Sequence, residues 1–392
     1  FLYSNVGYKA LGLLLEAVAG KPYRAIVQER IFDPLGMTGA ANAITSERRR
    51  DLATGYRPWF DDRPPLAAAG VAEAPWLETT TADGSLAASA GELSAFLRLL
   101  LNGGAGPNGR LLGEASFDLM RQPFAKMSDG VHYGYALMLS TCDGQPQIGH
   151  TGGMPGFVSA MLGLPNAGVG VVVLINGPGD PEAIGRFALR ATASAVRGDA
   201  LPEPPALLDP AAVANAADYA GTFVGEAGTI RLEPTGAGVD LAAGDERASL
   251  LPRGDDAFLA AHPDLSLFLF RFGRDEAGQV VEATYGPNWY RGERHVGPTT
   301  FASPDAWRAF PGHYRSYNPW QSNFRVGLRQ GQLWLFWPDG REQRLQLTAT
   351  GFQPTAEPNS PLRLIFDAIV DGHALRARWN SGDDVYYRFF TP

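Results

Sequence analysis

Apolar residues recur at helical spacing in several stretches of the first two hundred residues. Between residues 5 and 19 they follow one another at intervals near three and four, which predicts an amphipathic helix that ends at Gly20. The same pattern predicts helices over residues 24–32, 91–101 and 181–197. The apolar face of the first helix is formed by Val6, Leu11, Leu14, Leu15 and Val18.

Three shorter stretches have the pattern of β-strands, namely residues 134–139, 157–162 and 169–175. The last is apolar throughout and rich in valine, as expected for a central strand that is buried on both faces. Helices, then strands, then a returning helix predict an α+β domain in which helices pack on an antiparallel sheet. We assign residues 1–198 to this domain.

The pattern changes after residue 198. Residues 199–217 begin with a proline-rich stretch and are predicted to be a linker. Beyond it, short alternating strands with Gly and Asp turns predict two all-β domains, at residues 218–297 and 310–392.

The two β-rich regions resemble each other. Tyr219–Phe223 matches Phe310–Tyr314, and Leu267–Phe270 matches Leu362–Ile365, with an offset that stays near about 94 residues along the whole region. Several matches in the same order favour a duplication of one small β-domain. The alternative is chance alternation in two unrelated sheets.

The composition excludes some classes of function but does not identify one. The net charge is −8 and the sequence contains three lysines, so no basic stripe is available for a nucleic-acid backbone. No apolar run reaches the length of a membrane span. The histidines lack the close spacing of a zinc site, and we expect neither a metal nor another cofactor. The single cysteine, Cys142, excludes an internal disulfide.

Two short motifs in the first domain carry candidate chemistry. Tyr3-Ser4-Asn5 lies at the start of the first predicted helix, where an isolated tyrosine would be an ordinary surface residue near a fraying end. Gly149–Phe157 is dense in glycine and is predicted to be a turn before a strand, where the backbone can approach a ligand closely.

Together these motifs resemble those of the serine β-lactamase-related hydrolases, a family that includes class C β-lactamases, penicillin-binding D-Ala carboxypeptidases, D-aminopeptidases and related esterases. That family has three motifs in order: Ser-x-x-Lys, Tyr-x-Asn, and Lys or His followed by Thr or Ser and Gly. Tyr3-Ser4-Asn5 corresponds to the second and His150-Thr151-Gly152 to the third. The resemblance extends over residues 1–197 and includes the flanking stretches Ile31–Met37, Gly84–Ser89 and Tyr133–Tyr135.

The first motif of the family is not in this sequence. The residues three before Lys9, Lys21 and Lys126 are Val6, Val18 and Pro123, so no Ser-x-x-Lys occurs. We expect a segment upstream of Phe1 to supply the nucleophilic serine and its lysine. The alternative is a catalytically inactive binding or sensor protein that keeps the cleft and lacks the nucleophile.

The resemblance implies a role for each motif residue. Tyr3 would act as general base and then as general acid, and Asn5 would hold the lysine and the substrate carbonyl, unless it only caps the helix. The backbone N–H of Gly153 is a candidate oxyanion-hole donor, together with that of the expected serine.

His150 stands where the family's β-lactamases and carboxypeptidases usually have lysine. A histidine with an ordinary pKa is mostly neutral at pH 7, which favours esters, amides or peptides recognised at their amino end over carboxylate-bearing substrates. The expected activity is hydrolysis of an ester, an amide or a D-amino-acid peptide bond through an acyl-enzyme, with a small molecule or short peptide as substrate. The candidate catalytic residues are Tyr3, Asn5 and His150, and the candidate substrate-binding residues are Thr151, Gly152 and Gly153.

The resemblance also implies the form of the β-rich regions. D-aminopeptidase-like relatives carry two small antiparallel barrels, and barrels of about eight strands are usually filled by their own side chains rather than by a ligand. Gly286–Tyr290 and Tyr317–Gln321 are predicted to be loops with exposed aromatic residues, which either limit substrate size or attach the barrels to the hydrolase domain. A periplasmic or secreted location fits the family, and the oligomeric state stays open.

Overall fold

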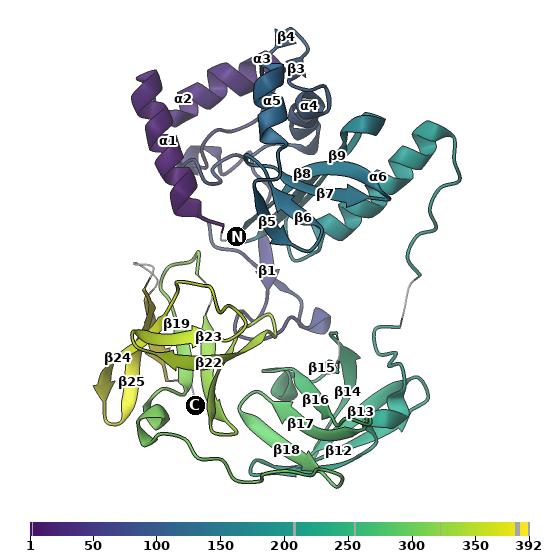
Figure 1. The fold of residues 1–392 in the computed structure, drawn as a ribbon, viewed down its shortest axis with the longest axis vertical. Helices are drawn as coiled ribbons and strands as arrows, with labels where there is room; N and C mark the ends of the chain where they lie inside the picture. Colours follow the sequence, from purple (N-terminus) through teal and green to yellow (C-terminus); the bar gives the residue numbers. More distant parts are fainter. Residues whose placement is uncertain (2, 207–208, 255, 322, 381–384, 391–392) are drawn as a thin grey trace. The chain divides into compact units, whose positions relative to one another are not determined.

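The computed structural model describes residues 1, 3–206, 209–254, 256–321, 323–380 and 385–390, and the chain forms two compact units (Figure 1). The first unit comprises Phe1–Arg57 and Val71–Pro205, and the second comprises Pro58–Gly70 and Ala206–Pro392. The loop at residues 58–70, which the sequence analysis includes in the first domain, therefore lies in the second unit.

The first unit is built on a six-stranded antiparallel sheet with the order β10-β9-β8-β7-β6-β5. Its strands are β5 (Ala125–Ser128), β6 (Val131–Tyr133), β7 (Met138–Cys142), β8 (Gln145–Met154), β9 (Phe157–Leu164) and β10 (Val169–Ile175). Its helices are α1 (Asn5–Ala19), α2 (Tyr23–Val27), α3 (Asp33–Leu35), α4 (Ala90–Leu101), α5 (Glu114–Met120) and α6 (Pro181–Arg197). A π-helical turn over Gln28–Phe32 joins α2 to α3, and two short ladders pair β1 (Tyr56–Pro58) with β2 (Val71–Glu73) and β3 (Ala105–Gly106) with β4 (Gly109–Arg110).

Helices α4 and α6 cover opposite faces of the sheet. Gly163 and Gly170 are direct partners on β9 and β10, and a Cβ at Gly170 would lie 2.5 Å from Leu97 of α4. The two glycines thus let α4 pack closely against the strands. On the other face, Leu162 packs with the fully buried Leu189 of α6. Neighbouring residues of a strand point to opposite faces of the sheet. Residue 163 faces α4 and residue 162 faces α6, so the two helices lie on opposite faces.

The first helix forms as predicted, but it packs through a different face. Ser4 caps α1 by accepting from the N–H of Gly7 (3.1 Å), and Gly20 ends it in the left-handed conformation (φ 63°). Its buried or half-buried residues are Tyr8, Gly12 and Glu16, spaced four apart. The apolar stripe of the helix is largely exposed, with exposed fractions from 46% at Leu15 to 79% at Val18.

The predicted central strand is an edge strand in the described sheet, so that prediction was wrong. β10 pairs only with β9 and ends the sheet order. Its apolar pattern follows from α4 and α6, which cover both of its faces, whereas the open edge leaves most of its residues half-buried and Leu174 exposed. An all-apolar strand sequence indicates that both faces of the strand are covered. It does not indicate whether the strand has one or two neighbouring strands in the sheet.

The strand predicted at residues 134–139 begins late. The N–H of Gly134 donates to the carbonyl of Leu137 (2.8 Å), and Ala136 has a φ of 58°, so the chain turns before β7 begins at Met138. A Cβ on Gly134 would lie 2.1 Å from the Met120 carbonyl oxygen, so the glycine allows close packing of this turn.

The second unit contains two closed eight-stranded antiparallel barrels, which confirms the predicted fold class of an α+β domain followed by two all-β barrels (Figure 1). The strands of the first barrel are β11 (Gly221–Gly225), β12 (Gly228–Thr235), β13 (Gly238–Ala243), β14 (Glu246–Pro252), β15 (Ala257–Ala260), β16 (Phe270–Arg274), β17 (Val280–Tyr285) and β18 (Asn288–Gly292). Those of the second are β19 (Gly312–Arg315), β20 (Phe324–Arg329), β21 (Gln332–Phe336), β22 (Glu342–Thr348), β23 (Gly351–Pro354), β24 (Leu364–Val370), β25 (His373–Trp379) and β26 (Val385–Phe389).

The two barrels repeat each other strand for strand. Phe258 pairs with Phe270 across β15 and β16, and Phe352 pairs with Leu364 across β23 and β24. Phe270 therefore corresponds to Leu364, not to Ile365, so the predicted match in this stretch is wrong by one residue. Both equivalent residues are almost fully buried in their barrels. Their interiors are packed with side chains from the inward-facing positions of the strands.

Segment 58–70 is attached to both barrels by polar contacts. Asp61 pairs with Arg315 (2.6 Å) and Asp62 pairs with Arg325 (2.9 Å), both on the second barrel. Arg63 donates to the carbonyl of Pro263 in the first barrel (3.2 Å).

The stretch predicted to be a loop at 286–290 is mostly strand. Trp289 lies in β18, is half-buried, and donates from its indole N–H to Glu282 (2.6 Å). Its ring also lies edge-on to His295 and Phe301, with centroids 5.2 and 5.4 Å away. Trp289 therefore packs within its own barrel. The other stretch does form a loop, and Trp320 is 47% exposed there.

Candidate active site

The start of α1 and the far half of β8 come together in the first unit. Tyr3 precedes the helix and its ring centroid lies 6.1 Å from that of His150 on β8. Asn5 is the first residue of α1 and is exposed, while Ser4 provides the cap. The alternative in which Asn5 only caps the helix is therefore wrong.

The predicted glycine-rich turn is in fact the end of a long strand. His150, Thr151, Gly152 and Gly153 all lie in β8, and the turn to β9 is formed by Pro155 and Gly156. Glycine has no side chain, so a strand that contains glycines leaves room for a ligand to approach its backbone. Glycines are equally common in turns, and the composition of this stretch therefore did not distinguish a strand from a turn.

Only one side of this part of β8 is paired. The ladder with β7 ends at the pair Met138–Gly149, whereas the ladder with β9 continues to Met154–Phe157. Within the part of the chain that the structure describes, residues 150–154 therefore have a partner strand on the β9 side only. A Cβ at Gly152 would lie 2.6 Å from Ser159 Oγ, whereas one at Gly153 would meet nothing within 4 Å.

Five aromatic side chains form a cluster at this point, and one of them is Phe1, whose ring centroid lies 5.1 Å from that of Tyr133. The ring of Tyr3 stacks on that of Tyr8 with a centroid distance of 5.6 Å and lies edge-on to Tyr133 at 6.2 Å. Tyr133 in turn lies edge-on to His150 at 5.7 Å. Tyr3 is 44% exposed, whereas Tyr133 is buried beneath it.

A chain of hydrogen bonds runs through the cluster. The hydroxyls of Tyr8 and Tyr133 are 2.9 Å apart, and the Tyr133 hydroxyl is 2.8 Å from Nε2 of His150. Nδ1 of His150 lies 2.5 Å from the carbonyl oxygen of Thr151. A carbonyl can only accept, so Nδ1 carries the proton, Nε2 accepts from Tyr133, and the Tyr133 oxygen accepts from Tyr8. Both nitrogens of His150 are thereby engaged within the protein.

The phenols of the cluster favour their neutral forms. Burial raises the pKa of Tyr3, and the neighbouring Tyr8 raises it further, while the nearby hydroxyl of Tyr133 opposes the shift. Burial also raises the pKa of Tyr133 far above its ordinary value, and the neighbouring Tyr8 adds to the shift. A general base at Tyr3 therefore needs a cation close by. Lys9, the nearest lysine in the sequence, pairs with Asp83 at 3.5 Å.

The sequence analysis did not assign roles to Tyr8 and Tyr133. Tyr133 begins one of the flanking stretches on which the family resemblance rests, and that was the available signal. Tyr8 lies on the buried side of α1, which only becomes apparent once the packing face of the helix is known.

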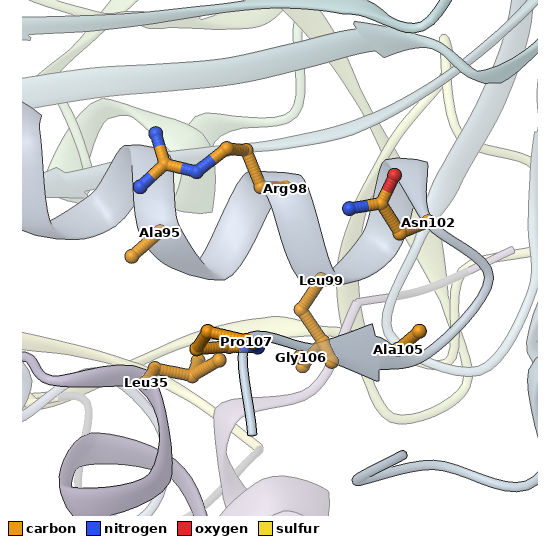
Figure 2. A pocket seen from close by; sticks show the side chains of 8 residues that line it. All are labelled: Leu35, Ala95, Arg98, Leu99, Asn102, Ala105, Gly106 and Pro107. Carbon is orange, nitrogen blue, oxygen red and sulfur yellow. The ribbon is translucent and has the colours of Figure 1, made fainter. Parts of the chain in front are cut away.

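The described residues also form a pocket and a group of potential metal ligands away from the motif residues. A pocket of about 170 Å³ in the first unit lies along α4, with Arg98 and Asn102 as its polar side chains, and none of the motif residues lines it (Figure 2). In the first barrel, Glu246, His262 and Asp264 bring their ligand atoms within 4.8 Å of one another. His262 already pairs with Glu246 (3.0 Å) and accepts from the N–H of Asp264 (3.3 Å).

Comparisons with known proteins identify relatives of the first half of the chain. Residues 1–195 match the family model described as Beta-lactamase. Penicillin-binding protein 4 of Amycolatopsis lactamdurans is 28% identical over 184 residues, which cover 45% of this chain and 47% of that protein. The first unit thus has the sequence of a β-lactamase-type domain, and this part of the chain belongs to the serine β-lactamase-related family.

Solved structures show weaker likenesses. The octameric penicillin-binding protein homologue from Pyrococcus abyssi is 21% identical, with a TM-score of 0.47 over 74% of this chain and 64% of that chain. D-amino acid amidase from Ochrobactrum anthropi is 26% identical, with a TM-score of 0.40 over 50% of this chain and 57% of that chain. Across the residues that the structure describes, no helix is both long and apolar enough to cross a membrane.

Proposed function

We propose that this chain belongs to a serine hydrolase that cleaves an ester, an amide or a D-amino-acid peptide bond through an acyl-enzyme. The observation that carries the proposal is the meeting of Tyr3 and His150, whose ring centroids are 6.1 Å apart although 147 positions separate them in the sequence. One small substrate can contact both groups at that distance. Family membership of residues 1–195 supports the reaction class.

The nucleophile in this proposal is a Ser-x-x-Lys serine on a segment that precedes Phe1. Its lysine would supply the cation that Tyr3 needs, because burial and Tyr8 raise the pKa of the phenol. The open edge of β10 and the exposed apolar stripe of α1 are surfaces that such a segment could cover.

The open side of β8 is the proposed place for the substrate carbonyl. In an antiparallel ladder, hydrogen-bonded pairs alternate with non-bonded pairs, and the pair Met154–Phe157 closes the two-residue turn. We infer that Thr151 and Gly153 direct their backbone groups away from β9, toward the unpaired side. The Gly153 N–H would then serve as an oxyanion-hole donor, worth about 3 kcal/mol in the transition state.

His150 has a positioning role in this proposal. Nε2 accepts from Tyr133 and Nδ1 donates to Thr151, so the ring presents no free nitrogen to a substrate carboxylate. This agrees with the expectation that carboxylate-bearing substrates are not preferred. A catalytically inactive binding protein is the alternative, and it is favoured by the absence of Ser-x-x-Lys from the printed sequence.

The test begins with the open reading frame upstream of Phe1. If it encodes Ser-x-x-Lys, we expect the intact protein to hydrolyse a p-nitrophenyl ester with a burst of acyl-enzyme, and Tyr3→Phe to lower kcat about 10²- to 10⁴-fold, the contribution of a general acid–base group. Tyr135→Phe is the matched control, because Tyr135 is an exposed tyrosine that stacks on Phe124. Any other residue in the serine position, or equal losses in the two variants, would favour the binding protein.

A further inference from the structure

A second cavity, of about 360 Å³, lies entirely within the second unit. Its volume is at the lower end of the range of small-molecule sites. Apolar side chains of both barrels form most of its wall, including Phe268 of the first barrel and Phe336, Phe389 and Phe390 of the second. The rings of Phe268 and Phe336 contact each other, with centroids 5.2 Å apart, so the cavity lies where the two barrels meet.

A histidine in this wall is buried, and only one of its two ring nitrogens has a hydrogen-bond partner among the described residues. His313 lines the cavity, is only 4% exposed, and lies directly opposite Arg325 in the ladder between β19 and β20. Nε2 of His313 is 2.9 Å from the amide oxygen of Asn323, whose own NH₂ group donates to the carbonyl of Asp61. The amide orientation makes Nε2 the donor and leaves Nδ1 as a bare acceptor.

Nδ1 of His313 has no hydrogen-bond partner among the described residues. Burial lowers the pKa of His313, and the nearby Arg325 and Arg315 lower it further, although Asn323 and Asp62 oppose the shift. The ring is therefore neutral at pH 7. A buried acceptor of this kind is costly unless something donates to it.

Positive charge lies beside this acceptor. Arg325 lines the cavity and pairs with Asp62 through one Nη atom, while its Nε is buried without a partner among the described residues. Arg388 also lines the cavity, and its guanidinium lies over the ring of Phe390 at 5.7 Å. A Cβ on Gly312 would lie 3.1 Å from the guanidinium carbon, so the glycine leaves the space that Arg388 occupies.

We propose that this cavity binds a small apolar carboxylate that also carries a hydrogen-bond donor, the chemistry of a free apolar amino acid. The carboxylate pairs with Arg388 and the unpartnered Nε of Arg325. The ammonium group donates to Nδ1 of His313, and the side chain packs against the phenylalanines. The site does not depend on hydrolase activity, because every group that forms it belongs to the second unit.

The experiment uses the whole chain and phenylalanine as the probe. Binding is followed by the ¹⁵N resonances of the His313 ring, assigned by their loss in His313→Gln, so that a ligand at His150 is distinguished from one in this cavity. We expect a saturable shift at Nδ1 of His313. We also expect 2-phenylethylamine, which lacks the carboxylate, and 3-phenylpropionate, which lacks the donor, each to bind about tenfold more weakly or worse.

The charge is tested by Arg388→Gln, with Arg308→Gln as the matched control, because Arg308 is an exposed arginine of the same barrel that does not line the cavity. We expect Arg388→Gln to weaken phenylalanine binding about tenfold or more and Arg308→Gln to leave it unchanged. The absence of a saturable His313 shift at about 10 mM phenylalanine would overturn the proposal, since that is ten times a weak dissociation constant of about 1 mM. Equal affinities for 2-phenylethylamine and phenylalanine would also overturn the proposal. That comparison uses the unaltered protein, so it can be made even if Arg388→Gln does not fold.

Discussion

A buried ion pair in the second barrel allows a sharp test of the packing. Arg329 and Glu342 approach to 2.8 Å, and their side chains are only 4% and 7% exposed. Arg329 also donates to the carbonyl of Gly286 in the first barrel (2.7 Å), and its guanidinium lies 4.0 Å from the centre of the Trp334 ring. Burial lowers the pKa of Arg329, whereas Glu342 raises it.

Replacing only the acid leaves a buried cation without its partner. We therefore expect Glu342→Met to lower the free energy of unfolding by about 3–5 kcal/mol, the usual cost of breaking a buried pair. Replacing both residues removes the buried uncompensated charge and leaves only the partly exposed Arg271, which lies 3.6 Å from Glu342, without this partner, so Arg329→Met/Glu342→Met should cost less than Glu342→Met alone. The double variant still loses the contact with Gly286, which is worth about 1–3 kcal/mol when a buried carbonyl is left unpaired.

The matched control is Glu233→Met on the outside of the first barrel. Glu233 pairs with Arg231 at 3.1 Å, but their side chains are 58% and 66% exposed, so the loss should be below about 1 kcal/mol. Urea unfolding followed by tryptophan fluorescence measures all three variants. Equal losses in Glu342→Met and Glu233→Met would refute the reasoning, and so would a double variant that is less stable than Glu342→Met.

Two further predictions concern hydrogen-bonded tyrosines. Tyr133→Phe removes the donor to Nε2 of His150, so we expect the histidine ¹⁵N spectrum to show a second tautomer. In an active intact enzyme we expect kcat to fall while thermal stability changes little, and an unchanged spectrum would contradict the assigned chain of hydrogen bonds. Hydrogen bonds from Arg274, and more weakly from Tyr219, lower the pKa of Asp256, so its stabilising contribution is full above the unfolded pKa of about 3.9 and is lost as the pH falls through the lower folded pKa. The stability difference between the unaltered protein and Asp256→Asn should therefore be constant near neutral pH and shrink below about pH 4; a difference that grows with acid would be opposite in sign to this linkage.

Much of the fold was predictable because its patterns are local. The helices at α1, α4 and α6 follow from apolar spacing and caps, and the barrel repeat follows from ordered matches along the chain. The one-residue error near Phe270 arose because the stretch before β16 is apolar on consecutive positions, so alternation did not fix its face. The structure fixes it through the pairing of Phe258 with Phe270.

The sequence predicted the motif residues of the candidate site but not the other residues that contact them. Tyr3 and His150 were selected by motif order, and their catalytic roles stay predictions. The hydrogen-bond chain through Tyr8 and Tyr133 could not be derived from spacing, because it depends on which face of α1 is packed. The apolar stripe suggested the opposite face, whereas the packed face of α1 centres on Gly12, where a Cβ would lie 2.4 Å from that of Ala82.

Segment 58–70 shows that a structural unit can include residues from inside the sequence range of another unit. Before it, the N–H of Tyr56 donates to the carbonyl of Asn176, and Gly55 packs so closely on the turn after β8 that a Cβ there would lie 2.6 Å from the Phe157 ring. The chain then enters the second unit, where Asp61 and Asp62 neutralise arginines of the second barrel. Residues 206–392 alone would lack both carboxylates, leaving two partly buried guanidinium groups without these partners. The barrels therefore depend on a segment that lies, in the sequence, between two parts of the first unit.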